Sequence, residues 1–285
     1  MLLAGLLFSS MVAFVKFLGT RIPSYEIVFF RSSIQIFSMM AIFWRIGFSS
    51  LKTKRPGLQG IRALLAVVLI NCNYYAFTKL PIADATAIGF SRNLFLVILA
   101  ALFLHEKVRL NRMLVTCAGF AGILLISPPG SDFSAASWVA LAGAGLGATM
   151  MILVRTLTFS DSNEVMMTYP ALATVIASII PTWIGWVSPT LSEFFLLVLM
   201  SYVGMLGQWC MIQAFRLGET TAVAPASYIR IVFATIIGVY LFAEIPETVT
   251  IAGVLIIIVS NLILINQERH ISESAGEKRV PGDVT

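Results

Sequence analysis

The sequence predicts an all-α integral membrane protein whose ten transmembrane helices form two inverted five-helix repeats around a central cavity. Three observations lead to this prediction: the composition, the number of long apolar runs, and a fixed spacing between charged residues inside those runs. Of the 285 residues, 58% are hydrophobic and 12% are charged. Soluble chains carry about 25% charged residues, so this much apolar surface indicates a protein embedded in a bilayer.

Ten apolar runs divide the chain. A bilayer core of about 30 Å requires about 20 apolar residues in an α-helix. The predicted spans are residues 2–19, 24–46, 61–79, 82–104, 110–127, 135–155, 164–186, 192–214, 221–243 and 248–266. Proline, glycine and serine mark many of the breaks between them, as at Pro23, Pro56 and Pro189. The polar residues 267–285 are predicted to form a disordered cytoplasmic tail.

Charged residues recur along the chain at one spacing. Arg92 and Arg230 are 138 residues apart, as are Glu106 and Glu244 (230 − 92 and 244 − 106). Charges inside apolar spans are rare and costly, so these matches carry more weight than coincidences among apolar residues. We therefore interpret the chain as two copies of one unit.

The two predicted repeats, residues 1–127 and 135–266, hold five spans each. An odd number of spans makes the second repeat enter the membrane upside down, an architecture typical of secondary transporters with a binding site near the midplane. With Arg31, Arg92 and Arg230 left aside as residues deep inside spans, the lysines and arginines number 13 on one predicted face and 3 on the other. By the positive-inside rule, both termini are predicted to be cytoplasmic.

Each repeat places one arginine deep in the membrane. Arg92 lies 14 residues from Glu106 (106 − 92), or about 21 Å along a helix, which takes it past the middle of the bilayer. Arg230 has the same spacing from Glu244, but at the opposite face. In the functional interpretation, the two arginines attract a carboxylate or phosphate of a substrate. In the alternative, they tie helices together by donating to backbone carbonyls, such as those freed by Pro225.

Polar and aromatic residues near the two arginines complete the predicted substrate site. A pocket for an amphipathic metabolite needs flat apolar walls and a few placed hydrogen-bonding groups. The candidates beside Arg92 and Arg230 are Asn73, Tyr74, Ser91, Trp209 and Tyr228. Such polar residues also join helices to one another, so we expect about half of the polar residues around the arginines to be structural.

Two glutamates open spans on opposite sides of the membrane. Glu26 begins the second span and Glu164 the seventh. A carboxylate at a helix N-terminus is stabilised by the helix dipole, which is one interpretation of both residues. The other is a role in gating or coupling, with Arg31 as the partner of Glu26.

The sequence contains no set of residues that indicates an enzyme. There is no Ser/His/Asp arrangement, no pair of catalytic carboxylates and no metal-binding cluster, and the two histidines, His105 and His270, fall outside the membrane core. We therefore predict a non-enzyme without cofactor or metal. Its expected partners are a small-molecule substrate and the lipid bilayer. Nucleic acid is not expected, because the basic residues lie mainly in loops and the tail.

The motifs of both halves resemble the drug/metabolite transporter superfamily, specifically the bacterial EamA-type permeases. The resemblance rests on the following stretches: YEIVFFR (25–31), YYAFTKLPIADATAIGFSRNLF (74–95), LFLHEKVRLNR (102–112), GFAGILLISPPG (119–130) and APASYIRIVFATIIGVYLFAEIPE (224–247). It implies ten helices in two inverted repeats and a cavity lined largely by the third, fourth, eighth and ninth helices. Relatives move amino acids, aromatic metabolites, S-adenosylmethionine, riboflavin and metallophores. Many relatives carry proline where this chain has Asn93.

The sequence therefore predicts a permease that moves a small organic metabolite by alternating access. An anionic, zwitterionic or aromatic substrate, similar to an amino acid, follows from the arginines and aromatic residues. The alternative is a lipid-handling or scramblase-like protein, which requires a lateral opening between helices and little polar lining.

Overall fold

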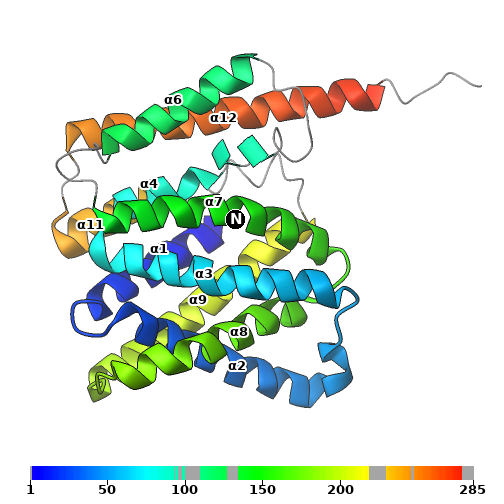
Figure 1. The fold of residues 1–285 in the computed structure, drawn as a ribbon, viewed down its shortest axis with the longest axis vertical. Helices are drawn as coiled ribbons and strands as arrows, with labels where there is room; N and C mark the ends of the chain where they lie inside the picture. Colours follow the sequence, from blue (N-terminus) through cyan, green and yellow to red (C-terminus); the bar gives the residue numbers. More distant parts are fainter. Residues whose placement is uncertain are drawn as a thin grey trace, which may run out of the picture.

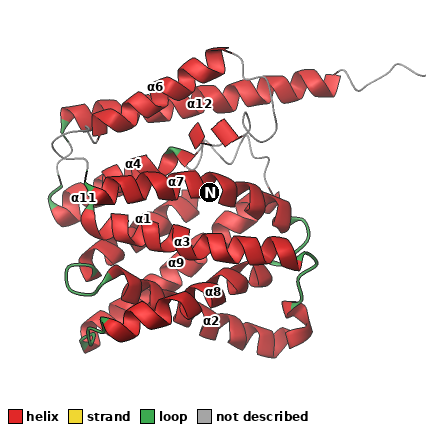
Figure 2. Cartoon of the chain, in the orientation of Figure 1, coloured by secondary structure: helices red, strands yellow, loops and turns green. Residues whose placement is uncertain are grey.

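The computed structural model describes residues 2–92, 94–95, 98–99, 110–126, 134–217, 229–244 and 247–277. Within these ranges the chain is helical and contains no strand (Figure 2). The α-helices are α1 (Leu2–Leu18), α2 (Ser24–Ile46), α3 (Pro56–Lys79), α4 (Ile82–Phe90), α6 (Leu110–Ile126), α7 (Ala135–Thr158), α8 (Asn163–Ile184), α9 (Leu191–Leu217), α11 (Ile229–Phe242) and α12 (Thr248–Glu277). A short 3₁₀ helix, η1 (Phe48–Leu51), follows α2. The all-α fold class is confirmed.

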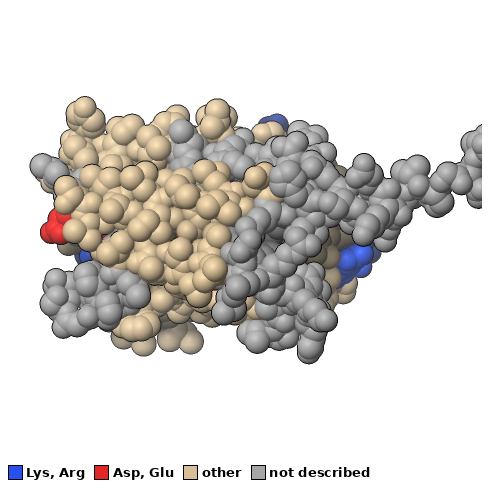
Figure 3. Space-filling view, turned by 90° about the horizontal axis from the view of Figure 1, so that it is seen from above, with Lys and Arg blue, Asp and Glu red and all other residues tan. Residues whose placement is uncertain are grey.

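Five of the described helices are long and apolar enough to cross a membrane: α2, α3, α7, α8 and the Leu191–Ala214 part of α9. The outer surface of the bundle is apolar as well. Trp44 is 83% exposed and Trp183 is 86% exposed. Seen from above, the described surface is almost wholly uncharged, with charged side chains only at its rim (Figure 3). Large apolar side chains on such a surface indicate contact with lipid.

Local sequence signals set several helix boundaries. Pro56 stands in the first turn of α3, where its missing N–H is not needed. The helix therefore starts five residues before the apolar run that begins at residue 61. Gly47 follows α2 with a φ of 92°, a conformation that favours glycine. Ser134 and Ser162 accept hydrogen bonds from backbone N–H groups in the first turns of α7 and α8.

Helices α2 and α8 pack antiparallel along their length. Near the start of α2, the Tyr25 hydroxyl donates to the Gly185 carbonyl oxygen at 3.2 Å. At the other end, the Tyr169 hydroxyl donates to the carbonyl oxygen of Leu51, beyond α2, at 3.1 Å. The start of each helix therefore meets the end of the other.

The remaining helices form a bundle with one peripheral pair. Helix α1 packs on α9 and α11, and α7 packs on α3 and α4. Helices α6 and α12 lie side by side in a separate layer at the top of Figure 1 and reach the bundle through α4. A Cβ at Gly122 of α6 would lie 2.9 Å from the Gly253 carbonyl oxygen of α12. This glycine therefore allows the two helix backbones to approach closely.

The last helix is longer than the sequence predicts. Residues 267–285 are expected to be disordered, but α12 continues through Glu277. The segment from Gln267 to Glu277 is rich in helix-forming residues, and the first proline after it is Pro281. Polarity alone is therefore a poor guide to the end of this helix.

Candidate functional site

The bundle encloses a cavity of about 280 Å³ between its two ends. Described residues from α1, α2, α3, α4, α7, α8, α9 and α11 line it, together with Arg92 just after α4. The peripheral helices α6 and α12 contribute no described lining residue. The family resemblance implies a cavity lined largely by the third, fourth, eighth and ninth helices, which are α3, α4, α9 and α11. In the structure, residues of α1, α2, α7 and α8 line the cavity as well. Such a volume is at the lower end of the range for small-molecule sites.

Arg92 and Arg230, the two predicted membrane arginines, both line this cavity. The Arg92 guanidinium lies 5.3 Å from the centre of the Phe90 ring. The Arg230 guanidinium lies 5.3 Å from the ring centre of Phe8 and 6.0 Å from that of Phe77. The faces of aromatic rings attract cations, so these contacts hold the two guanidinium groups against the walls of the cavity. The two charges are also close enough to repel each other.

A third arginine, Arg31 of α2, lines the cavity and is 6% exposed. It donates from Nη2 to the side-chain oxygen of Gln208 at 3.3 Å, and its guanidinium lies 5.8 Å from the centre of the Tyr74 ring. The predicted partnership with Glu26 is wrong, because no ion pair joins these two described residues. Positions five residues apart project about 140° apart around a helix. Glu26 is fully buried and instead accepts a hydrogen bond from the Val187 N–H at 3.0 Å.

The fourth arginine in the cavity, Arg62 of α3, is not among the sequence-predicted site residues. It is 4% exposed and donates from Nη1 to the Met166 carbonyl oxygen at 2.6 Å and to the Gln59 side-chain oxygen at 3.3 Å. Pro170 explains the first bond, because a proline has no N–H to offer the carbonyl four residues before it. Pro170 in the α8 sequence signals a carbonyl without a helical partner, but it does not indicate which donor reaches that carbonyl.

The other predicted site residues divide into three groups. Asn73 and Tyr74 line the cavity. Ser91 is buried, but its hydroxyl donates to the Ile88 carbonyl oxygen at 2.6 Å, and it is not part of the described lining. Trp209 is 42% exposed on α9 and faces away from the cavity, whereas its neighbour Gln208 lines it. Tyr228, like Asn93, lies outside the described residues.

Glu164 stands in the first turn of α8, the position that the helix dipole favours for a carboxylate. It is partly exposed and lies outside the described cavity lining. Its backbone carbonyl accepts a hydrogen bond from Thr168 at 2.7 Å. The capping interpretation therefore fits its position.

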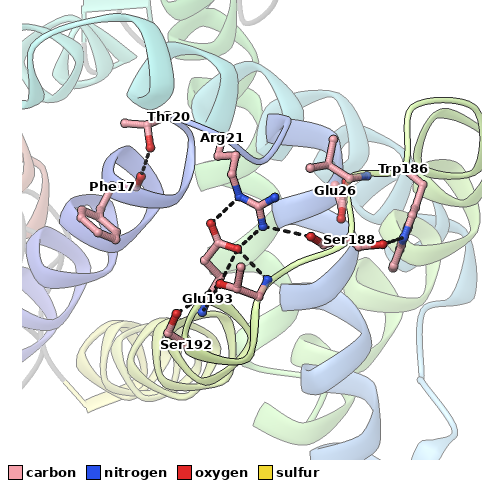
Figure 4. A network of polar contacts seen from close by, with 10 residues as sticks. Phe17, Thr20, Arg21, Glu26, Trp186, Ser188, Ser192 and Glu193 are labelled. Atoms are coloured by element: carbon pink, nitrogen blue, oxygen red, sulfur yellow. Dashed lines mark hydrogen bonds and ion pairs between the residues drawn. The ribbon is translucent and has the colours of Figure 1, made fainter.

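One end of the bundle, here called the Lys16 end, holds ion pairs between helices. Lys16 of α1 pairs with Glu244 after α11 and also donates to the Leu80 carbonyl oxygen at 3.0 Å. The other carboxylate oxygen of Glu244 accepts from the Ile82 N–H at 2.9 Å. Figure 4 shows the second pair, in which Arg21 binds Glu193 of α9 through two nitrogens. These contacts tie α1, α4, α9 and α11 together at this end of the bundle.

The opposite end, here called the Asp161 end, is built around one carboxylate. Asp161 is 7% exposed and accepts hydrogen bonds from the Thr53 hydroxyl at 2.6 Å, the Gln59 amide at 2.8 Å and the Lys54 N–H at 3.1 Å. Burial by itself raises the pKa of this carboxyl, but the three hydrogen bonds and the charge of Arg62 outweigh burial. The pKa of Asp161 therefore lies below its ordinary value.

The matching family model and the similar curated proteins are all described as transporters. The chain matches the model of the EamA-like transporter family over residues 1–127 and 133–266. It is 32% identical to the S-adenosylmethionine uptake transporter of Rickettsia bellii, over 89% of this chain and 88% of that protein. It is also 32% identical to the pseudopaline exporter CntI of Pseudomonas aeruginosa, over 92% of this chain and 93% of the exporter.

Two further similarities are more distant. The riboflavin transporter of Brucella anthropi is 28% identical over 90% of this chain and 94% of its own. One solved crystal structure, 18% identical, has a TM-score of 0.62 and covers 93% of this chain and 97% of its own. At that level of identity, the last similarity concerns the fold alone.

Proposed function

Because the chain belongs to the EamA-like transporter family, we propose that it is a secondary transporter that moves a small organic metabolite across a bacterial inner membrane. The substrate in this proposal is anionic, zwitterionic or aromatic. The relatives support a metabolite as cargo, since they are named for S-adenosylmethionine, pseudopaline and riboflavin. They also differ from one another, so the substrate class has to be argued from this chain's own residues.

One observation carries the proposal: Arg92 and Arg230, which are 138 residues apart, line the same cavity. Two arginines at equivalent positions of the two repeats can line one cavity only if that cavity lies between the repeats. The rings of Phe8, Phe77 and Phe90 lie beside them. Flat apolar walls with a few charged donors are the features of a small-molecule site.

The way the helices pair supports alternating access as the mechanism. The 138-residue spacing makes α1 the counterpart of α7, and α3 that of α9. The packing of α1 on α9 then corresponds to the packing of α7 on α3, and the counterparts α2 and α8 pack on each other. This pattern supports two inverted repeats, and rocking of one repeat on the other would expose the cavity to each side in turn.

The two ends of the bundle have roles in this cycle. With both termini cytoplasmic, the Lys16 end faces outward and the Asp161 end faces the cytoplasm. The ion pairs at the Lys16 end join α1 to α9 and α11, elements that would separate when the outer mouth opens. Glu26, which holds the Val187 N–H after α8, acts at the same end as an anchor of the outer turn.

The test is transport by two single variants in membrane vesicles. Metabolite profiling of cells with and without the protein, inside and outside the cells, first identifies the cargo. Arg92→Ala and Arg230→Ala are then expected to abolish its transport while the protein still reaches the membrane. Arg45→Ala, at an exposed position near the end of α2, is the matched control and is expected to transport normally.

Two outcomes would contradict the proposal. Unchanged transport in either cavity variant removes that arginine from the site. Flipping of dye-labelled lipid in liposomes, together with no metabolite transport at all, favours the scramblase alternative.

A further inference from the structure

We infer that the face of α4 formed by Thr86 and Gly89 is a contact surface for the transported molecule. Gly89 leaves room for the molecule to lie against the helix, and the Thr86 hydroxyl forms a hydrogen bond with one of its polar groups. The inference rests on the proposed function and adds two specificity-determining residues to it. Both residues line the cavity, and they share one face of α4 because they are three positions apart.

Gly89 is open to the cavity in a helix that is otherwise almost wholly packed. Seven of the nine residues of α4 are buried, and the two exceptions are Asp84 and Gly89. A Cβ at position 89 would meet no described atom of another part of the chain within 4 Å. The cavity side of Gly89 is therefore free of protein contacts from the described residues.

The two usual structural reasons for a glycine do not apply to Gly89. The first is a left-handed backbone, but Gly47 is the only described glycine with a positive φ. The second is close packing, as at Gly119, where a Cβ would lie 2.7 Å from a side-chain carbon of Leu94. A glycine inside a helix costs stability relative to alanine. The advantage that remains for glycine at position 89 is the room that it leaves in the cavity.

Thr86 adds an unpaired hydroxyl to the same face of α4. The residue is 4% exposed, and its Oγ1 has no hydrogen-bond partner. Thr174 of α8, by contrast, donates to the carbonyl oxygen of Pro170, four residues before it, at 2.7 Å. A buried hydroxyl without a partner is costly. Threonine has two favourable χ1 rotamers in a helix, so this hydroxyl can turn toward a bound molecule that supplies the missing partner.

Stability and transport are expected to respond in opposite directions at these two positions. Gly89→Ala and Thr86→Val should unfold at or above the temperature of the parent in detergent, because alanine favours a helix and valine removes an unpaired hydroxyl. The matched controls Gly119→Ala and Thr174→Val should unfold at lower temperatures, because the first introduces a clash and the second breaks a hydrogen bond. A clear loss of stability in both Gly89→Ala and Thr86→Val assigns these residues to packing and overturns the inference.

Transport in membrane vesicles is measured with the metabolite that profiling identifies. Gly89→Ala, Gly89→Val and Gly89→Leu are expected to lose transport progressively, by about tenfold or more for leucine. Thr86→Val should transport about tenfold more slowly at low substrate concentration, because one hydrogen bond is lost. Gly60→Leu is the size-matched control and should transport normally, since Gly60 is an exposed glycine of α3 outside the described cavity lining. Normal transport in both Gly89→Leu and Thr86→Val overturns the inference.

Chemical labelling tests the position of Gly89 without any substrate. The full-length protein, with alanine in place of its three cysteines Cys72, Cys117 and Cys210, receives either Gly89→Cys or Ala87→Cys and is treated with iodoacetamide in detergent. Ala87 is the matched position, because it is fully buried in the same helix and is not part of the described lining. We expect the thiol at position 89 to react and the thiol at position 87 to stay unmodified. Equal reactivity of the two thiols, or an unreactive thiol at position 89, overturns the inference. Should Gly89→Leu fail to fold, this labelling and Gly89→Ala still decide.

Failure of this inference can be distinguished from failure of the proposed function. A metabolite that moves equally well in the parent, Gly89→Leu and Thr86→Val removes the inference and leaves the transporter. A parent protein that moves no metabolite removes the transporter. The unfolding temperatures and the labelling then still decide whether Gly89 and Thr86 belong to the packing of the bundle or to the surface of its cavity.

Discussion

The Lys16 end and the Asp161 end of the bundle are held by different kinds of contact. At the Lys16 end, two cations meet two carboxylates across helices, in the pairs Lys16–Glu244 and Arg21–Glu193. At the Asp161 end, one carboxylate collects donors from the segment between α2 and α3 and from the start of α3. The Arg21 side chain is 43% exposed, whereas the Asp161 residue is 7% exposed.

This difference indicates that one end of the bundle contributes more to folding stability and that the other end opens more easily. Exposed ion pairs contribute little to stability, because water solvates the separated charges almost as well. A buried donor that loses its acceptor, as the Gln59 amide would without Asp161, keeps the full cost of desolvation. The Asp161 end is therefore expected to carry more of the folding free energy, and the Lys16 end to break and re-form with less change in free energy. An end that opens during each cycle would have this property. Four predictions test the contrast, in order of decreasing effect.

The largest effect is expected from Asp161→Ala. The change leaves the Thr53 hydroxyl, the Gln59 amide and the Lys54 N–H without their acceptor. We expect a loss of about 3 kcal/mol in the free energy of unfolding, measured by thermal unfolding in detergent. Asp161→Asn keeps one acceptor oxygen and should cost less. An unaltered unfolding temperature in Asp161→Ala would show that the Asp161 end does not carry more of the folding free energy than the Lys16 end.

An intermediate effect is expected from Lys16→Met. This pair is better shielded than the other one, with side chains 17% and 20% exposed, so the change leaves the Glu244 carboxylate poorly compensated. We expect a loss of about 2 kcal/mol. The double variant with Glu244→Gln should recover part of it, and a double-mutant cycle on unfolding temperature measures the coupling. Additive effects of the two changes would show that the pair contributes nothing as a pair.

A smaller effect is expected from acid. Because the native pKa of Asp161 lies below its ordinary value of 3.8, its contribution is complete above that value. The contribution is lost as the pH falls through the lower native pKa. Unfolding temperatures recorded against pH should therefore drop in this acidic window, and the drop should be shallower in Asp161→Asn. The same slope in both proteins would assign the acid sensitivity to other groups.

The smallest effect is expected from Arg21→Gln. The lost contacts are those to Glu193 and to the Ser188 carbonyl oxygen, which accepts at 2.9 Å, and all three residues lie at the surface. We expect an unfolding temperature that is nearly unchanged and that depends less on salt than in the parent, because salt screens exposed pairs. Glu193→Gln serves as the matched change on the other side of the pair. A large loss of stability in either variant would place folding energy at the Lys16 end.

Apolar run length predicts the bounds of a long membrane helix well, because the run has to match the thickness of the bilayer. The run 24–46 and helix α2 have the same limits. Features that depend on which way a helix faces were harder to predict. Gln208 and Trp209 are neighbours on α9, but the first lines the cavity and the second is 42% exposed on the outside. The sequence alone does not determine how α9 is rotated about its own axis, because this rotation depends on the packing of the helices.

Cavity residues near helix ends were also missed. Arg62 counts as a loop cation in the charge tally, because it lies at the start of an apolar run. In the structure α3 begins at Pro56, so Arg62 is inside the helix and reaches the carbonyl that Pro170 leaves without a helical partner. Arg92 and Arg230 were found because their isolation within apolar sequence is itself a signal. The contribution of Arg62 depends on a contact between distant segments that no local pattern contains.

Helix α12, with 30 residues, is about 45 Å long. This exceeds the hydrocarbon thickness of a bilayer by about 15 Å. Its final turns, which are polar from Gln267 onward, are therefore expected to lie outside the hydrocarbon of the bilayer. A fluorescent protein or an affinity tag attached after the chain would stand clear of the lipid headgroups without any added spacer.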